Sequence, residues 1–221
     1  MSLNTLNMNT EYRDFGYKGP GPANGSVGRN LAEIFVDLTR RLDGVNQICD
    51  LGCGNGYLAS RLGLSGYQVT GIDASESGLE IAGRHYATDR VNFARAEFGS
   101  DLKKVLPENL GFDAVVSSDV IEHLYRPAVL IEAATALLKP GGYLIVGTPY
   151  HGYLKNLAIS VLNRWDSHHG VNWDGGHIKF FSVRTMRDLI ARHGFQDISF
   201  HCYGRLPWLW MHMICVARRG P

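Results

Sequence analysis

Glycines and acids at the ends of two apolar runs are the residues of this chain best suited to chemistry. The first run ends at Asp50 and opens into residues 52–56, Gly-Cys-Gly-Asn-Gly, where glycines alternate with small side chains. Glycine has no Cβ, so such a turn lets bare backbone approach a ligand closely. The second run, residues 69–72, also ends in an acid, Asp73. At that place in an open α/β sheet a carboxylate can accept hydrogen bonds from a ribose, which predicts a nucleoside-containing cofactor.

The spacing of the glycines separates two classes of cofactor. Dinucleotide-binding loops follow G-x-G-x-x-G, where the third glycine allows a helix to pack closely on a strand. Here Gly52, Gly54 and Gly56 follow G-x-G-x-G, and Tyr57 stands where the third glycine would be. This spacing argues against a bound pyrophosphate, although a nicotinamide-dependent oxidoreductase on a related fold is kept as an alternative.

The segment D-L-G-C-G-N-G at residues 50–56 resembles the first motif of class I S-adenosylmethionine-dependent methyltransferases. Residues 112–124, FDAVVSSDVIEHL, are similar to the fourth motif of that family, and residues 137–144, LLKPGGYL, to the segment that leads into its fifth strand. The matches run from about residue 45 to 150. The Glu-His pair and the layout are most similar to the ubiquinone-biosynthesis O-methyltransferase group and to type 11 and type 12 methyltransferase domains.

The resemblance implies S-adenosylmethionine as cofactor and methyl transfer as activity. The loop would approach the methionine part of the cofactor, Asp73 the ribose, and Ala96 and Glu97 the adenine, with Ser118 on the methionine side. Asp50 is expected to act indirectly, by orienting loop amides or through water. The expected cofactor-binding residues are Asp50, Gly52, Cys53, Gly54, Asn55, Gly56, Asp73, Ala74, Ala96, Glu97 and Ser118.

Acidic and imidazole side chains follow the expected fourth strand at residues 112–117. If this segment is helical, Asp119, Glu122 and His123 share one face and could bind a divalent cation. In the ubiquinone-pathway relatives the matching positions are associated with a metal, but Asp119 is one methylene shorter than the Glu found there. We therefore expect a buried polar network and no metal. His123 is the first candidate for a general base, because an imidazole pKa near ~6.5 suits proton removal at neutral pH.

Residues 149–180 interrupt the alternation of helices and strands and are expected to form a substrate lid, since long loops in compact domains tend to be functional. Four of the nine histidines lie here: His151, His168, His169 and His177. They lack the paired spacing and cysteine partners typical of zinc sites. His177 is the second candidate for a catalytic residue. A sulfonium methyl is already activated, so alignment is the main task of the enzyme; the histidines favour a hydroxyl acceptor, which needs a base.

Alternating helical and strand patterns predict an α/β fold, a Rossmann-like, mostly parallel sheet with helices on both faces. The resemblance implies seven strands, with the last one antiparallel between the fifth and sixth. We expect an N-terminal cap segment at 1–28 and a methyltransferase domain at 29–221 that contains the lid. The expected helices are 29–42, 57–64, 75–86, 127–138 and 182–193, and the expected strands are 45–50, 68–73, 91–94, 112–117, 143–148, 198–203 and 211–217.

Two apolar segments outside these motifs carry further expectations. The aromatic residues Tyr12, Phe15 and Tyr17 either close over the cofactor or pack into the core. Residues 206–211, LPWLWM, are expected to pack against the lid, with a dimer contact, a membrane-surface contact and a wall of the substrate pocket as alternatives.

Composition narrows the class of protein. A net charge of +1 over 221 residues gives no electrostatic reason to expect nucleic acid as a partner. Four scattered cysteines do not make a disulfide scaffold, and no signal peptide or membrane-spanning run is recognised. We expect a cytoplasmic monomer or homodimer, without stable membrane insertion, that acts on a small molecule. A quinone or phenol, a sugar and a lipid precursor stay open as acceptors, and an inactive methyltransferase-like subunit stays open as the non-enzyme alternative.

Overall fold

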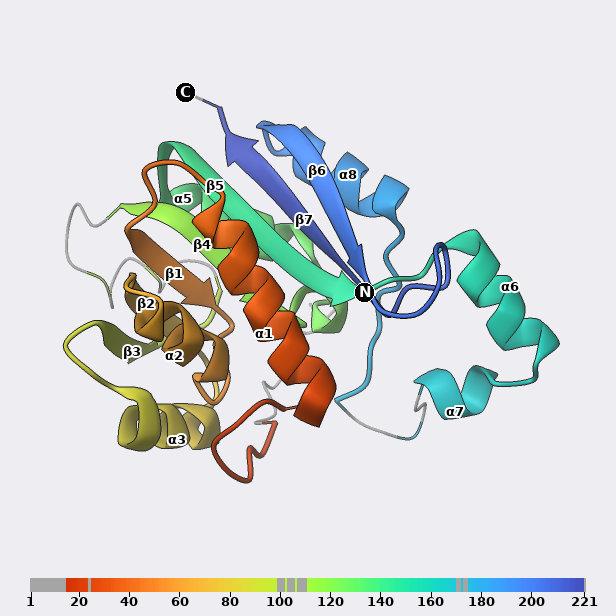
Figure 1. Ribbon diagram of the computed structural model, residues 1–221, viewed down its shortest axis with the longest axis horizontal. Helices are drawn as coiled ribbons and strands as arrows, with labels where there is room; N and C mark the ends of the chain where they lie inside the picture. Colours follow the sequence, from red (N-terminus) through yellow and green to blue (C-terminus); the bar gives the residue numbers. More distant parts are fainter. Residues whose placement is uncertain are drawn as a thin grey trace, which may run out of the picture.

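A seven-stranded sheet with the order β3-β2-β1-β4-β5-β7-β6 forms the centre of the computed structural model (Figure 1). The structure describes residues 15–23, 25–98, 102, 106, 111–169, 172 and 175–220. Neighbouring strands from β3 to β5 are parallel, and β7 is antiparallel to both β5 and β6. The predicted fold class and the antiparallel last strand are therefore confirmed. The strands are β1 (Gln47–Leu51), β2 (Gln68–Asp73), β3 (Val91–Arg95), β4 (Phe112–Ser118), β5 (Leu138–Pro149), β6 (Phe195–Tyr203) and β7 (His212–Arg219).

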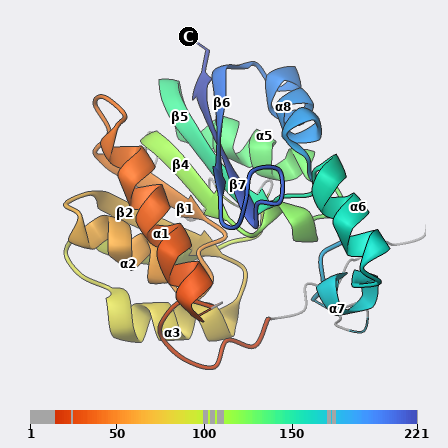
Figure 2. The same ribbon diagram turned by 45° about the vertical axis from the view of Figure 1, so that its right-hand side comes forward.

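Helices cover both faces of this sheet (Figures 1 and 2). On one face, α1 (Gly25–Arg40) and α2 (Tyr57–Leu64) bury residues such as Phe35 and Leu62 against alternate strand residues. On the other face, α5 (Ala128–Leu137) and α8 (Val183–Arg192) bury Ile131 and Met186 in a second cluster. Because both faces are buried, the central strands are nearly continuous apolar runs, as parallel sheets require.

Two helix starts follow their predicted capping chemistry. The Ser75 side chain accepts a hydrogen bond from the Gly78 amide at the start of α3 (Glu76–Tyr86). Ser182 and Thr185 form a reciprocal capping box at the start of α8. No helix within the described ranges is both long and apolar enough to cross a membrane.

Several element boundaries differ from the prediction, and the largest differences are at the starts of α1, β5 and β6, which begins at Phe195 and not at residue 198. Helix α1 begins at Gly25, before the expected start at residue 29, and ends at Arg40. Strand β5 begins at Leu138, directly after α5, so residues 139–142 lie in the strand and do not precede it. The reason is long-range pairing: Leu138 pairs with Phe112 on β4, and an irregularity in register follows. Glycine and proline in this segment indicated a break, but the sheet accommodates it as a bulge.

The carboxyl ends of the parallel strands form the edge where the predicted site residues gather. The segment 149–180 leaves the sheet at this edge and carries α6 (Tyr153–Val161) and α7 (Trp165–His169), which project away from the sheet (Figures 1 and 2). Its two ends are tied to the fold, because the Tyr150 amide donates to the Met211 carbonyl at 3.0 Å and the His151 amide to the Phe181 carbonyl at 2.8 Å.

Candidate active site

The glycine loop after β1 is held by hydrogen bonds to β2 and to the turn that follows it. The Gly52 amide donates to the Ile72 carbonyl at 2.8 Å. The Asp73 carboxylate accepts the Gly54 amide at 2.8 Å through Oδ2 and the Ser75 amide at 2.7 Å through Oδ1. The loop and the acid predicted to form one site therefore do lie together, because β1 and β2 are parallel neighbours.

Two glycines of this loop have conformations and surroundings that exclude a side chain. Gly52 has φ +84°, and a Cβ on it would lie 2.5 Å from Cγ2 of Val120. Gly54 has φ +52°, and a Cβ on it would collide with the Tyr17 hydroxyl. Both residues occupy the left-handed region, which favours glycine. The loop backbone is therefore closely approached from two sides.

Asp50 is a buried carboxyl group behind the loop, only 2% exposed. The backbone of Ala59 in α2 hydrogen-bonds to it, but its Oδ2 has no hydrogen-bond partner within the described part of the chain. Burial, with a smaller contribution from the charge of Asp73, raises the pKa of Asp50 to about 7. A buried oxygen atom without a partner beside the loop fits the predicted indirect role of Asp50 toward the ammonium group of S-adenosylmethionine.

The N-terminal segment lies against the same loop. Asn55 is buried, and its Nδ2 donates to the carbonyl oxygens of Gly19 at 3.0 Å and Gly21 at 2.8 Å. Tyr17, from this segment, contacts Gly54. The Asn55 amide group therefore holds the N-terminal segment at the loop, a role that the sequence did not indicate. Of the other two aromatic residues considered for this cover, Phe15 is exposed and Tyr12 lies outside the described residues.

The other predicted cofactor residues lie along the same edge of the sheet. Ala74 follows β2, and the amide of Ala96, just after β3, donates to the Asp73 carbonyl at 3.0 Å. Glu97 is exposed, and Ser118 at the end of β4 is half-buried. Their contacts with a cofactor stay predictions, as do those of the buried Cys53 and of Gly56.

The helix that would have placed Asp119, Glu122 and His123 on one face does not form. Only the single 3-10 turn η1 (Ile121–His123) follows β4, and Asp119 before it has a left-handed backbone, with φ +55°. The Asp119 carboxylate instead faces β7, where its Oδ1 lies 3.2 Å from Nε2 of His212. Asp119 is therefore not on a common helical face with the other two, although its charge still acts on both of them.

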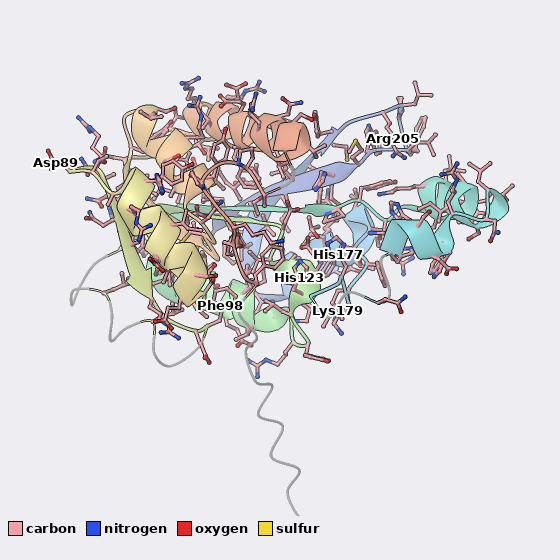
Figure 3. All side chains as sticks on the ribbon, turned by 90° about the horizontal axis from the view of Figure 1, so that it is seen from below. Asp89, Phe98, His123, His177, Lys179 and Arg205 are labelled. Carbon is pink, nitrogen blue, oxygen red and sulfur yellow. The ribbon has the colours of Figure 1, made fainter. Side chains whose placement is uncertain are left out.

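Glu122 and His123 are joined by His177 instead. The amides of Ile178 and Lys179 both donate to the Glu122 carbonyl at 3.0 Å, which docks the end of segment 149–180 on η1. The rings of His123 and His177 then meet edge to face, with centroids 4.9 Å apart (Figure 3). His177 Nε2 lies 3.9 Å from Oε1 of Glu122. The two predicted catalytic histidines are thus adjacent.

Burial controls the protonation of this cluster. It raises the pKa of Glu122 to about 8, helped by the charge of Asp119, and Thr148 donates a hydrogen bond to Glu122 Oε2 at 2.9 Å. It also lowers the pKa of His123 and, together with the charge of His123, lowers that of His177 to about 4. At neutral pH both imidazoles are therefore neutral and able to accept a proton.

The same three side chains have the chemistry of metal ligands. One ligand atom from each of Glu122, His123 and His177 lies within 4.8 Å of the other two. They could hold a divalent cation only after Glu122 loses its proton, which its raised pKa opposes. The polar network without metal predicted from the sequence stays a prediction.

The raised pKa of Glu122 makes a testable difference to stability. The usual pKa of this carboxyl group is 4.5. Between that pH and about pH 8 it is therefore ionised in the unfolded chain and protonated in the folded chain. Stability from this group is therefore lost as pH rises through this window. Glu122→Gln should remove this loss, on the order of 2 kcal/mol between about pH 6 and about pH 8. Urea unfolding in EDTA at both pH values checks it, and an unchanged pH dependence in the variant would contradict the protonated state.

His212 and Thr148 are members of this cluster that sequence reasoning missed. Both lie at the carboxyl edge, since Thr148 is near the end of β5 and His212 begins the antiparallel β7, opposite Pro149. His212 is buried, and none of the described residues forms a hydrogen bond with its Nδ1. The antiparallel last strand was the available signal, because it brings its first residues to the edge where the parallel strands end.

Comparison with known proteins identifies the family of this chain. A family model described as a methyltransferase domain matches residues 24–199. The mitochondrial ubiquinone biosynthesis O-methyltransferase of Rattus norvegicus is 39% identical over 152 residues, which are 67% of this chain and 44% of that protein. The Chromobacterium violaceum ubiquinone biosynthesis O-methyltransferase is 35% identical over 162 residues, 62% of this chain and 68% of that protein. The matched region therefore covers 44% of the length of the first relative and 68% of the length of the second.

Solved structures share the fold. The methyltransferase SibL in its apo form has a TM-score of 0.69 at 18% identity and covers 88% of this chain and 56% of its own. An S-adenosylmethionine-dependent methyltransferase from Archaeoglobus fulgidus has a TM-score of 0.65 at 14% identity and covers 86% of this chain and 94% of its own. With the strand order and the glycine loop, the match over residues 24–199 shows that this chain belongs to the methyltransferase domain family.

Proposed function

We propose that this protein transfers the methyl group of S-adenosylmethionine to a hydroxyl group of a small molecule. The observation that carries the proposal is the position of two neutral imidazoles, His123 and His177, at the same sheet edge as the glycine loop and Asp73. The glycine loop and Asp73 suit a nucleoside cofactor, and the two imidazoles suit removal of a proton from a hydroxyl group. The relatives named O-methyltransferase support a hydroxyl acceptor.

Each part of the site has a separate task in this reaction. S-adenosylmethionine supplies an activated methyl group when bound. Asp73 and the loop amides position the ribose and methionine parts, and Asp50 orients the loop. His123 or His177 accepts the proton of the acceptor hydroxyl, while buried Glu122 positions His177. The segment 149–180 acts as the lid that excludes water, because its two ends are tied to the sheet edge and its end docks on η1.

The sequence also predicts a cytoplasmic monomer or homodimer with a cap at residues 1–28, and these stay predictions. Relatives include both bacterial proteins and a mitochondrial protein. The acceptor class stays a small molecule, since the net charge of +1 offers no attraction for nucleic acid.

Calorimetric titration of the unmodified chain with S-adenosylmethionine and S-adenosylhomocysteine tests the cofactor. We expect a dissociation constant in the micromolar range, which corresponds to a binding free energy on the order of −8 kcal/mol, and no heat of binding with NADH as control. A folded chain that binds neither sulfur nucleoside would overturn the proposed function. Binding of NADH in their place would instead support the oxidoreductase alternative.

A further inference from the structure

Segment 149–180 contains a buried lysine that forms no ion pair with any carboxylate that the structure describes. Lys155, in the first turn of α6, is only 4% exposed. Its Nζ donates one hydrogen bond, to the Tyr150 carbonyl at 2.7 Å. Within the part of the chain that the structure describes, no carboxylate forms an ion pair with it. An ammonium group in such a place is unfavourable unless something of opposite charge joins it.

The surroundings of Lys155 add positive charge. Burial and the nearby guanidinium of Arg205 lower the pKa of Lys155 to about 8. Burial also lowers the pKa of His168 and His169, and the Lys155 ammonium adds to this effect. Arg205 comes from the loop between β6 and β7, which lies beside the start of α6 (Figures 1 and 2). The amino-terminal end of α6 contributes partial positive charge at the same place. All of these groups favour an anion.

A second polar group in this region also lacks a partner. Nε2 of His169 is buried and has no hydrogen-bond partner among the residues that the structure describes. Its ring lies among aromatic side chains, with centroid distances of 4.3 Å to Trp165, 4.8 Å to Phe180 and 5.5 Å to His151. The ammonium and this imidazole are thus two unsatisfied polar groups on neighbouring elements of one segment, next to an aromatic wall.

This region adjoins the reacting end of the site. Burial is the main cause that lowers the pKa of His177, and the charge of His169 is among the smaller causes, so the two imidazoles interact. His177 lies in the same segment, whose end returns to His151 through the Phe181 carbonyl. In Figure 3 His177 is beside His123.

We propose that Lys155, together with His169 and Arg205, binds an anionic group of the acceptor, a carboxylate or a phosphate. The identity of the ligand as the methyl acceptor rests on the proposed function, whereas the anion site itself does not. Lys155 acts as a binding residue that selects acceptors with an acidic group and orients them, so that the hydroxyl group at the other end meets His123 and His177.

Titration of the cofactor-free protein with benzoate, phenyl phosphate and the neutral analogue phenol tests the site. We expect one of the two anions to bind at least about tenfold more tightly than phenol. Lys155→Met should abolish this preference, while Lys155→Arg should retain part of it. Arg164→Met is the matched control, because Arg164 is an exposed base of the same segment and should leave the preference unchanged.

Each outcome decides the proposal. A preference for benzoate identifies a carboxylate and a preference for phenyl phosphate a phosphate monoester, and both support the site. Equal binding of all three probes, or an anion preference that survives Lys155→Met, overturns it.

Thermal unfolding gives an independent test. Without ligand, Lys155→Met should raise the melting temperature, because it removes an uncompensated buried cation. A lower melting temperature would show a structural role for Lys155. S-adenosylhomocysteine is titrated separately, so its failure to bind would overturn the proposed function and leave the anion site.

Discussion

Replacing Asp73 with alanine should weaken binding of S-adenosylmethionine by about a hundredfold or more. The carboxylate has two tasks, which both end with this substitution. Its oxygens accept the amides of Gly54 and Ser75, at 2.8 and 2.7 Å, and so hold the glycine loop in its left-handed conformation. In the proposed complex it also accepts the ribose hydroxyls. Hydrogen bonds to a charged group are each worth about 1.5–3 kcal/mol, so losing two of them accounts for the expected size.

Calorimetric titration of matched variants checks this expectation. Asp73→Asn keeps the shape and one acceptor oxygen, and should lose less affinity than Asp73→Ala. Glu76→Gln is the control, since Glu76 is an exposed acid in the first turn of α3 and its charge is not expected to reach the cofactor. If a folded Asp73→Ala protein binds within about threefold of the unmodified chain, then Asp73 is a structural residue and the ribose assignment fails.

Replacing His177 or His123 with alanine should lower turnover by about a hundredfold to ten-thousandfold, as loss of a general base does. Affinity for the cofactor should stay near normal, because these rings contact each other, Glu122 and the backbone of residues 175 and 176, which lie outside the glycine loop. The pKa of His177 is held at about 4 by burial and by His123. If His177 is the base, the rate should therefore change little from about pH 6 to about pH 8 and fall as pH approaches that pKa.

Methyl transfer to a panel of phenols, catechols and hydroxybenzoates, measured at saturating cofactor, provides the test. The larger of the two losses identifies the base, and the smaller identifies the residue that positions it. His85→Ala serves as control, because His85 is exposed on α3, away from the cluster. Full activity in both His123→Ala and His177→Ala would remove the imidazoles from the mechanism. Loss of cofactor affinity together with turnover would show that they support the fold.

The sequence by itself determined the elements whose signals are local. Residues 57–64 and 68–73 were predicted with the bounds that the structure has, because a glycine turn, helical periodicity and a short apolar run each act over a few residues. The same holds for the Ser75 and Ser182 caps, whose hydrogen bonds reach only three residues along the chain. The pairing of the glycine loop with Asp73 was also readable, since neighbouring parallel strands end at the same edge.

Tertiary structure alone decided which polar side chains meet and which are buried. Asp119 does not share a helical face with Glu122 and His123, because its backbone is left-handed. Its carboxylate faces His212, on a strand that begins far along the chain. Glu122 gained His177 because residues 178 and 179 pair with its carbonyl. The sequence placed Lys155 in the expected lid without indicating its burial, and only packing against the Tyr150 region makes it a buried cation. Burial and long-range pairing depend on the whole chain, and they set the protonation states and contacts on which the proposed chemistry rests.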